Sequence, residues 1–185
     1  MGVALQAVKY LGQVQTGETV VVTGAGGGLG THAVQIGAAL GGRVMAVTSS
    51  PGKVEHLENL GATEVLGTGE TLDFSELVMA FTGDEGADVV IDTVGSPLFD
   101  STWHTLGQYG RLLLLGEVVG ERVKMNLAEV VFRDARILGS SGVSRAIVQE
   151  VSGLVSQGTL RPVVSRVLAL EAAATAVQDL SSRSV

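Results

Sequence analysis

The chain has 185 residues, of which 45% are apolar, so it is long and apolar enough for one domain with its own core. Its net charge of −7 argues against nucleic acid or an anionic membrane as a partner. The absence of cysteine excludes disulfides and thiolate zinc sites within the chain. No apolar run approaches the roughly 20 residues of a membrane span. Because Met1 is also not followed by a signal-peptide pattern, we expect a soluble, cytoplasmic protein.

Predicted helices and strands alternate along the chain, from residue 1 to residue 185. The helical period predicts helices over residues 4–11, 33–40, 51–60, 74–81, 96–106, 147–155 and 171–180. Apolar and β-branched runs predict strands over residues 20–23, 43–47, 63–66, 87–91, 110–115 and 135–139. A polar loop is expected over 116–126, and the pattern at 130–132 fits either a helix or a strand. This alternation predicts an α/β fold, a doubly wound parallel sheet of the Rossmann type, with its ligand at the carboxyl ends of the strands.

A buried strand, a glycine-rich turn and a helix follow one another in the first third of the chain. The strand ends at Thr23, and five of the next seven residues are glycine. A turn without side chains lets a pyrophosphate approach the backbone. The free N–H groups and the dipole at the start of the helix then stabilise its negative charge. The sequence therefore predicts a dinucleotide site at this turn.

The crowded glycines fit three spacings, which are Ala25-x-Gly27-x-x-Gly30, Gly24-x-x-Gly27-x-x-Gly30 and Thr23-Gly24-x-x-x-Gly28-x-Gly30. The first two are variants of the dinucleotide fingerprint, whereas the third is the pattern of short-chain dehydrogenases. That class needs a Tyr-x-x-x-Lys pair to protonate its substrate. Four residues after Tyr10 stands Val14, and four after Tyr109 stands Leu113, so this chemistry is absent.

The end of the second predicted strand indicates which dinucleotide is bound. NAD-binding proteins usually place an Asp or Glu here, about 20 residues after the motif, on the ribose hydroxyls. This chain instead has Thr48, Ser49 and Ser50, with Lys53 one helical turn later. Each residue alone has a plain alternative, with Ser50 as a helix cap before Pro51 and Lys53 as a solvated surface residue. Because they coincide at the ribose position, we expect NADP rather than NAD.

Five segments together resemble the cofactor-binding half of the medium-chain dehydrogenase/reductase superfamily. The similarity is to its quinone oxidoreductase, acryloyl-CoA reductase and zinc-type alcohol dehydrogenase branches. It covers almost the whole chain and rests on GETVVVTGAGGGLGTHAVQIGAALGGRVMAVTSSPGK (17–53), GATEVL (61–66), ADVVIDTVGS (87–96), GQYGRLLLLGEVVG (107–120) and RILGSSG (136–142).

The resemblance implies a role for each matching position in binding the cofactor. The pyrophosphate would be held by Gly24, Ala25, Gly26, Gly27, Gly28, Leu29 and Gly30. The adenosine ribose and its phosphate would be held by Thr48, Ser49, Ser50 and Lys53. The cleft would be lined by Thr93, Val94 and Gly95, and the nicotinamide flanked by the backbones of Leu115, Gly116, Ser140 and Ser141.

The resemblance also implies a longer enzyme. Family members carry a catalytic domain before this half, which supplies the substrate pocket and, in the alcohol dehydrogenases, the zinc ligands. We therefore expect the NADP(H)-binding domain of an oxidoreductase that transfers hydride to a quinone, enone or enoyl thioester, inactive as the chain stands. One alternative is the cofactor domain of a zinc-dependent alcohol dehydrogenase, with zinc ligands in the other domain. Another is a non-enzymatic dinucleotide-binding sensor or scaffold.

No catalytic residue and no metal ligand is assigned within the chain. Its histidines, His32, His56 and His104, are far apart and lack the i, i+4 spacing of a zinc pair. Asp92, near the end of a strand, is expected to cap the following turn. Trp103 is expected in the core.

The last predicted strand, residues 135–139, suggests how the protein assembles. An unprotected edge strand with apolar residues such as Ile137 tends to pair with another chain. Family members are commonly dimers through this edge. We expect a homodimer joined near residues 130–142.

Overall fold

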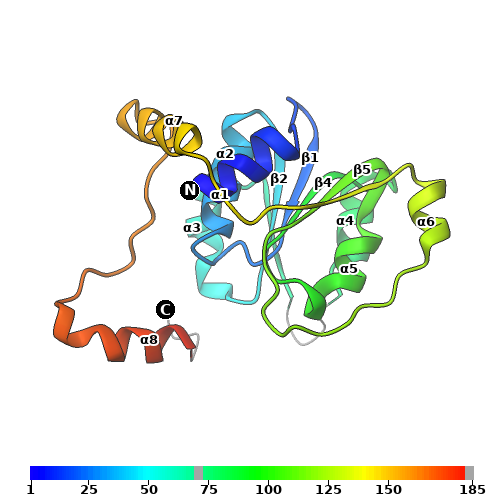
Figure 1. Cartoon of the computed structure of the whole chain (residues 1–185). Helices are drawn as coiled ribbons and strands as arrows, with labels where there is room; N and C mark the ends of the chain where they lie inside the picture. Colours follow the sequence, from blue (N-terminus) through cyan, green and yellow to red (C-terminus); the bar gives the residue numbers. More distant parts are fainter. Residues whose placement is uncertain (69–72, 182–185) are drawn as a thin grey trace.

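The computed structural model describes residues 1–68 and 73–181 and contains a six-stranded sheet (Figure 1). The strand order is β3-β2-β1-β4-β5-β6, and every neighbouring pair is parallel. The strands are β1 (Thr19–Val22), β2 (Arg43–Thr48), β3 (Glu64–Gly67), β4 (Ala87–Asp92), β5 (Leu106–Leu114) and β6 (Arg136–Gly139). The order reverses between β1 and β4, so the expected doubly wound fold is confirmed, with its switch point after β1.

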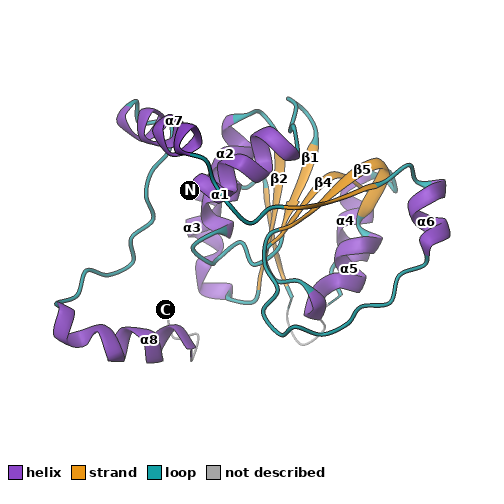
Figure 2. Ribbon diagram, viewed as in Figure 1, coloured by secondary structure: helices purple, strands orange, loops and turns teal. Residues whose placement is uncertain are grey.

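Helices cover both faces of the sheet (Figure 2). One face carries α1 (Gly2–Leu5), the π-helical turn η1 (Gln6–Leu11), α2 (Gly30–Ala39), α3 (Val54–Asn59) and α7 (Arg145–Ser156). The other carries α4 (Ser75–Thr82) and α5 (Phe99–His104), with α6 (Leu127–Phe132) beyond them. Short 3₁₀ turns are η2 (Pro51–Lys53), η3 (Ser96–Leu98) and η4 (Leu170–Ala172), the last leading into α8 (Ala173–Ser181).

The central strand shows why its residues are apolar throughout. Val20 and Val22 point into the core on the α2 side, and Val21 points into the core on the α5 side. All three side chains are completely buried, as expected of a parallel strand covered on both faces. Trp103 lies in the core on the α5 side of the sheet, and the sequence also predicts a core position for it.

Two local features differ from the sequence-based prediction, and a third resolves the open pattern at residues 130–132. β5 begins at Leu106 rather than at residue 110, because Leu106 pairs with Ala87 before an irregularity in register. Residues 130–132 are helical, within a helix whose first turn is capped by the side chain of Asn126. Ser50 occupies the expected N-cap position, but its hydroxyl accepts no hydrogen bond from the helix, which starts as a 3₁₀ turn.

Among the described residues, no helix has both the length and the apolar character needed to cross a bilayer.

Candidate cofactor-binding site

The glycine turn between β1 and α2 is shaped by two close approaches of the backbone. Gly24 has φ +59°, and a Cβ there would lie 2.4 Å from Oγ1 of Thr93. A Cβ on Gly30 would lie 2.3 Å from the carbonyl oxygen of Gly24. Any side chain at either position would force the turn away from its neighbours, so the sequence needs glycine at both. Leu29 stands at the N-cap of α2, and no side chain caps the helix. The N–H of Thr31 already donates to the carbonyl oxygen of Gly27 at 2.9 Å, so an anion would be held by the dipole of α2 and by the other N–H groups of the turn.

A cleft of about 570 Å³ opens at the carboxyl ends of β1, β2 and β4, beside this turn. We refer to it as the carboxyl-end cleft. Its lining includes nine of the residues predicted to bind the cofactor, namely Gly24, Gly26, Gly27, Thr48, Ser49, Ser50, Lys53, Thr93 and Val94. The remaining lining residues are Val47, Thr68, Pro97, Leu98, Val118, Val119 and Leu180.

The polar wall of this cleft is formed by the end of β2 and the η2 turn. Lys53 Nζ donates a 3.1 Å hydrogen bond to the carbonyl oxygen of Gly26, so the ammonium lies against the glycine turn. Oγ1 of Thr48 accepts from the backbone N–H of Ser50 at 3.1 Å, which leaves the hydroxyl hydrogen of Thr48 to donate elsewhere. The lining contains no carboxylate and no arginine among the residues that the structure describes.

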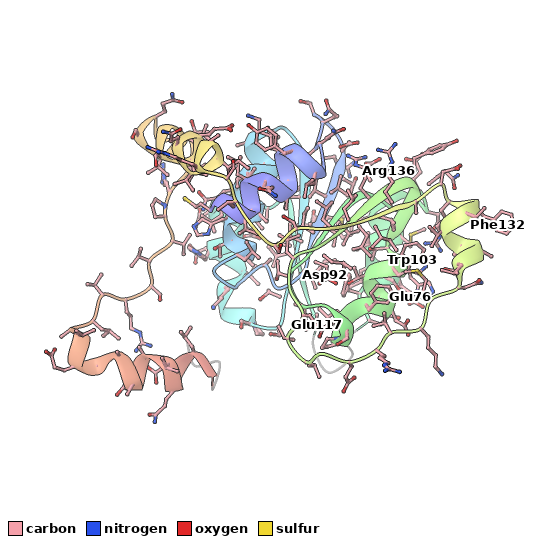
Figure 3. The ribbon with its side chains drawn as sticks, in the orientation of Figure 1. Glu76, Asp92, Trp103, Glu117, Phe132 and Arg136 are labelled. Atoms are coloured by element: carbon pink, nitrogen blue, oxygen red, sulfur yellow. The ribbon has the colours of Figure 1, made fainter. Side chains whose placement is uncertain are left out.

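Asp92, at the end of β4, ties β1 to the loop that follows β4. Its Oδ1 accepts hydrogen bonds from Thr23 Oγ1 at 2.6 Å, from the N–H of Val94 at 2.9 Å and from that of Gly95 at 3.0 Å. The carboxylate is completely buried (Figure 3). Asp92 therefore caps the turn, as the sequence predicts. Gly95 is not among the residues that line the cleft.

The residues predicted to flank the nicotinamide lie at the ends of β5 and β6, outside the lining of the carboxyl-end cleft. Leu115 N–H donates to Asp92 O at 2.8 Å, and Ser140 N–H donates to Leu114 O at 3.0 Å, so the parallel pairing continues past both strands. Oγ of Ser140 is buried and has no hydrogen-bond partner within the described part of the chain. Gly116 is partly exposed and Ser141 is exposed.

The other predicted phosphate-binding positions lie on the turn itself. Ala25 is buried beneath it, whereas Gly28 is exposed and a Cβ there would meet nothing within 4 Å. The structure thus brings the glycine turn and the residues after β2 and β4 into one cleft, and it leaves the ends of β5 and β6 beside it.

Sequence reasoning missed part of the apolar wall of the cleft. Val118 and Val119 come from the loop after β5, and Leu98 from η3. Glu117, also missed, holds that loop against Ser96 through its carboxylate. No spacing in the sequence links residues 21 positions apart in two irregular loops, so only the fold could reveal this contact.

The described residues offer no site for a metal ion, since no three His, Asp or Glu side chains among them come together. The three histidines lie on separate helices, α2, α3 and α5.

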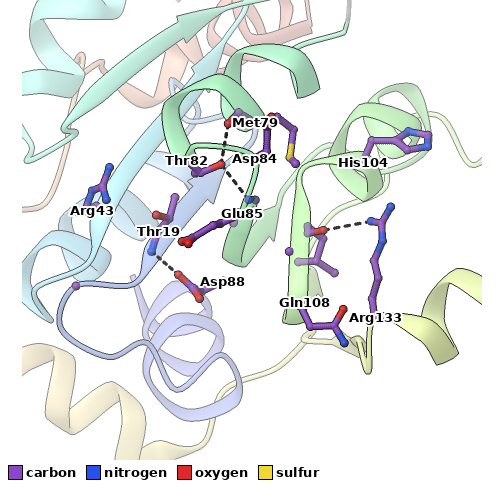
Figure 4. A pocket seen from close by; sticks show the side chains of 15 residues that line it. Thr19, Arg43, Met79, Thr82, Asp84, Glu85, Asp88, His104, Gln108 and Arg133 are labelled. Atoms are coloured by element: carbon purple, nitrogen blue, oxygen red, sulfur yellow. Dashed lines mark hydrogen bonds between the residues drawn. The ribbon is translucent and has the colours of Figure 1, made fainter.

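A second cavity, of about 630 Å³, lies at the opposite, amino ends of β1, β2, β4 and β5 (Figure 4). Three carboxylates, those of Asp84, Glu85 and Asp88, contribute to its lining together with Arg43 and Arg133. This cavity lacks a glycine turn leading into a helix, and its carboxylates would repel a pyrophosphate. The carboxyl-end cleft is therefore the candidate dinucleotide site.

Comparisons with known proteins identify the family to which the chain belongs. Residues 28–157 match a family model described as zinc-binding dehydrogenase. The chain is 32% identical to an acryloyl-coenzyme A reductase of Sulfurisphaera tokodaii over 171 residues, which cover 92% of this chain and 49% of that protein. It is 31% identical to a NAD-dependent alcohol dehydrogenase of Sulfolobus acidocaldarius over 186 residues, covering 100% of this chain and 53% of that protein.

A solved structure, the crystal structure of AibC, superposes with a TM-score of 0.93 and 37% identity over 100% of this chain and 51% of that one. The chain thus spans about half the length of the relatives that it matches. The chain belongs to the zinc-binding dehydrogenase family, in the medium-chain dehydrogenase/reductase superfamily of oxidoreductases, and corresponds to its C-terminal cofactor domain.

Proposed function

We propose that this chain binds NADP(H) in the carboxyl-end cleft and serves as the cofactor domain of an oxidoreductase. The substrate class of the whole enzyme would be a quinone, an enone or an enoyl thioester. The observation that carries the proposal is the meeting of the glycine turn with Thr48, Ser50 and Lys53 in a single cleft. The relatives named acryloyl-coenzyme A reductase support the enoyl thioester within that class.

The residues of the chain divide the work of holding the cofactor. The uncapped start of α2 and the glycine turn from Gly24 to Gly30 would hold the pyrophosphate. The backbones of Leu115, Gly116, Ser140 and Ser141 would flank the nicotinamide. The bound nicotinamide supplies the hydride chemistry, and the protein orients it and excludes water.

The choice of NADP over NAD rests on the polar wall of the cleft. The Lys53 ammonium and the Thr48 hydroxyl offer a cation and a donor to a 2′-phosphate. The described lining has no carboxylate to hold the ribose hydroxyls of NAD or to repel that phosphate. One or two charged hydrogen bonds imply roughly 10- to several-hundred-fold discrimination. Without an arginine to clamp the phosphate, we expect the lower part of that range.

Two rival functions remain to be separated from this proposal by experiment. A NAD-dependent alcohol dehydrogenase is among the relatives, so a zinc-dependent alcohol dehydrogenase is the first rival, with zinc ligands outside these residues. A non-enzymatic dinucleotide sensor or scaffold is the second. Bound zinc in the full-length protein would favour the alcohol dehydrogenase. A full-length protein that binds NADPH but does not oxidise it with any carbonyl or enone acceptor would favour the sensor or scaffold. A cytoplasmic location and a homodimer belong to the same proposal.

Titration calorimetry of the 185-residue chain with NADPH and NADH tests the proposal directly. We expect NADPH to bind about tenfold or more tightly than NADH. Equal affinities would overturn the NADP assignment while leaving a dinucleotide site. Failure of both cofactors to bind would overturn the site itself.

A further inference from the structure

Two loops at the carboxyl ends of the strands are held together by hydrogen bonds and close backbone contacts. The loop after β4 (93–96) and the loop after β5 (115–120) run side by side, with Val118 N–H donating to Val94 O at 3.0 Å. A Cβ on Gly95 would lie 2.5 Å from Oε2 of Glu117, and one on Gly116 would lie 2.3 Å from the carbonyl oxygen of Thr93. At Gly116 the loops touch backbone to backbone, and at Gly95 the side chain of Glu117 packs directly against the other loop.

Glu117 fastens this contact. Its Oε1 accepts hydrogen bonds from Ser96 Oγ at 2.7 Å, from Gly120 N–H at 2.8 Å and from Val119 N–H at 3.0 Å. Its Oε2 accepts from Ser96 N–H at 2.8 Å. We refer to these four hydrogen bonds as the Glu117 clamp. The donors, first the N–H of Gly120 and then the hydroxyl of Ser96, lower the pKa of Glu117 to about 2.

The clamp holds two exposed valines at the mouth of the cleft. Val118 is 58% exposed and Val119 is 57% exposed, yet both line the carboxyl-end cleft with Pro97 and Leu98. Thr48 and Lys53 line the same cleft. Apolar side chains that are fixed in place and exposed to water suit the face of a flat aromatic ring, whereas Thr48 and Lys53 suit a phosphate.

We propose that Glu117 is a positioning residue, which fixes Val118 and Val119 against the adenine ring of the dinucleotide by clamping residues 118–120 to Ser96. The inference rests on the proposed function, since it needs a dinucleotide in the carboxyl-end cleft. Glu117 itself need not touch the cofactor, because its carboxylate is fully engaged with the two loops. The valines belong to the adenosine half because they share their cleft with Thr48 and Lys53, and the ends of β5 and β6 lie outside it.

The variant Glu117→Gln tests the clamp with little change in shape. One carboxylate oxygen becomes an amide donor that faces N–H or O–H donors, so part of the clamp is lost. If the loop then holds its binding conformation only about a tenth of the time, the Kd for NADPH rises about tenfold. The matched control is Glu121→Gln, the same charge change at the exposed residue that directly follows this loop.

Binding of 2′,5′-ADP, the adenosine half of NADPH, distinguishes a positioning role at the adenine ring from a merely structural role. We expect Glu117→Gln to weaken 2′,5′-ADP and NADPH by the same factor, with Glu121→Gln like the parent for both. Ser96→Ala, which removes one of the four bonds, should weaken both by a smaller factor. Loss of NADPH binding with unchanged 2′,5′-ADP binding would overturn the proposal, because the loop would then act on the nicotinamide half.

A second variant tests the wall without touching the clamp. Val118→Ser combined with Val119→Ser keeps every hydrogen bond of Glu117 and should weaken 2′,5′-ADP by a similar factor. Unchanged 2′,5′-ADP binding in this variant would overturn the proposal even if Glu117→Gln failed to fold. If the parent chain binds NADPH and both variants bind NADPH and 2′,5′-ADP with the same affinity as the parent, only the positioning role is refuted. A parent that binds neither cofactor would refute the proposed function as well.

Discussion

The ammonium of Lys53 lies 3.1 Å from the carbonyl oxygen of Gly26, although the two residues are 27 positions apart. This contact joins the turn that is expected to bind the pyrophosphate to the lysine that is expected to bind the 2′-phosphate. A Cβ on Gly26 would lie 2.9 Å from Cδ of Lys53, so the lysine stem packs directly on the turn. The proposed pyrophosphate and ribose ends of the site therefore depend on one arrangement of β1 and β2.

Replacing Lys53 by alanine should weaken NADPH about tenfold and leave NADH nearly unchanged. The ammonium would contribute one charged hydrogen bond of roughly 1.5 kcal/mol to the 2′-phosphate, which NADH lacks. Arg43→Ala is the matched control, because it removes one positive charge at the opposite ends of the strands. Calorimetry with both cofactors decides the matter, and a loss shared by NADH would contradict the NADP assignment.

Thr48→Asp should reverse the cofactor preference. A carboxylate at the end of β2 would repel the 2′-phosphate of NADPH and accept hydrogen bonds from the free ribose hydroxyls of NADH. Thr48→Val removes the hydroxyl without adding charge and serves as the control. NADPH should then bind more weakly than to the parent, without the gain for NADH. If Thr48→Asp still preferred NADPH, the ribose would lie elsewhere.

The glycine turn offers a matched pair of substitutions. Gly30→Ala should destabilise the fold by roughly 1–3 kcal/mol, because its Cβ would meet the carbonyl oxygen of Gly24 at 2.3 Å and backbone must move. Gly28→Ala should leave the free energy of unfolding nearly unchanged, since nothing lies within 4 Å of its Cβ. Urea denaturation measures both. Similar midpoints for the two variants would show that the turn can relax.

Acidification should reveal His32 as a contact between the start of α2 and the chain after α7. Its Nδ1 lies 2.5 Å from Gly28 O, and Nε2 lies 3.5 Å from the N–H of Val163, so the neutral ring donates at one nitrogen and accepts at the other. Burial lowers the pKa of His32 below 6.5, despite the opposing hydrogen bond to Gly28.

Since the unfolded chain then binds the proton more readily, the free energy of unfolding should fall as the pH drops below about 6.5 and be insensitive to His32 at higher pH. Denaturation at several pH values measures this slope. His32→Gln should remove its share of the slope, and His56→Gln, at an exposed position, is the control. An identical slope in the parent and in His32→Gln would contradict the assignment.

The free edge of the sheet should make the protein a dimer, which the structure leaves as a prediction. β6 is the last strand of the sheet, as the sequence predicts, and Ile137 is 39% exposed on it. Beside it, α6 exposes Val131 to 69% and Phe132 to 79%. Sedimentation at tens of micromolar should show a dimer, and a monomer would contradict this. Ile137→Lys should dissociate it, whereas Val167→Lys, at a residue that is 89% exposed in the segment between α7 and η4, should not.

The sequence by itself determined the fold class, the order of the elements and the glycine turn. These follow from local patterns, because a strand buried on both faces must be apolar at every position and a helix repeats every 3.6 residues. The same local logic found Thr48, Ser50 and Lys53, since they follow directly after a recognisable strand. It also assigned Asp92 its cap, because an acidic side chain at a strand end commonly accepts from the next N–H groups.

Only the tertiary structure decided how the ends of separate strands combine. It brought the loops after β1, β2 and β4 into one cleft with Val118 and Val119 from the loop after β5, and it left the ends of β5 and β6 beside that cleft. It also extended β5 back to Leu106, because pairing with Ala87 is a contact between distant segments. The Glu117 clamp is also a contact between distant segments. Ser96 and Glu117 lie in two irregular loops, and no helix or strand period and no motif spacing in the sequence relates them. Contacts of this kind arise from the parallel packing of neighbouring strands, which places their carboxyl ends together regardless of distance along the chain.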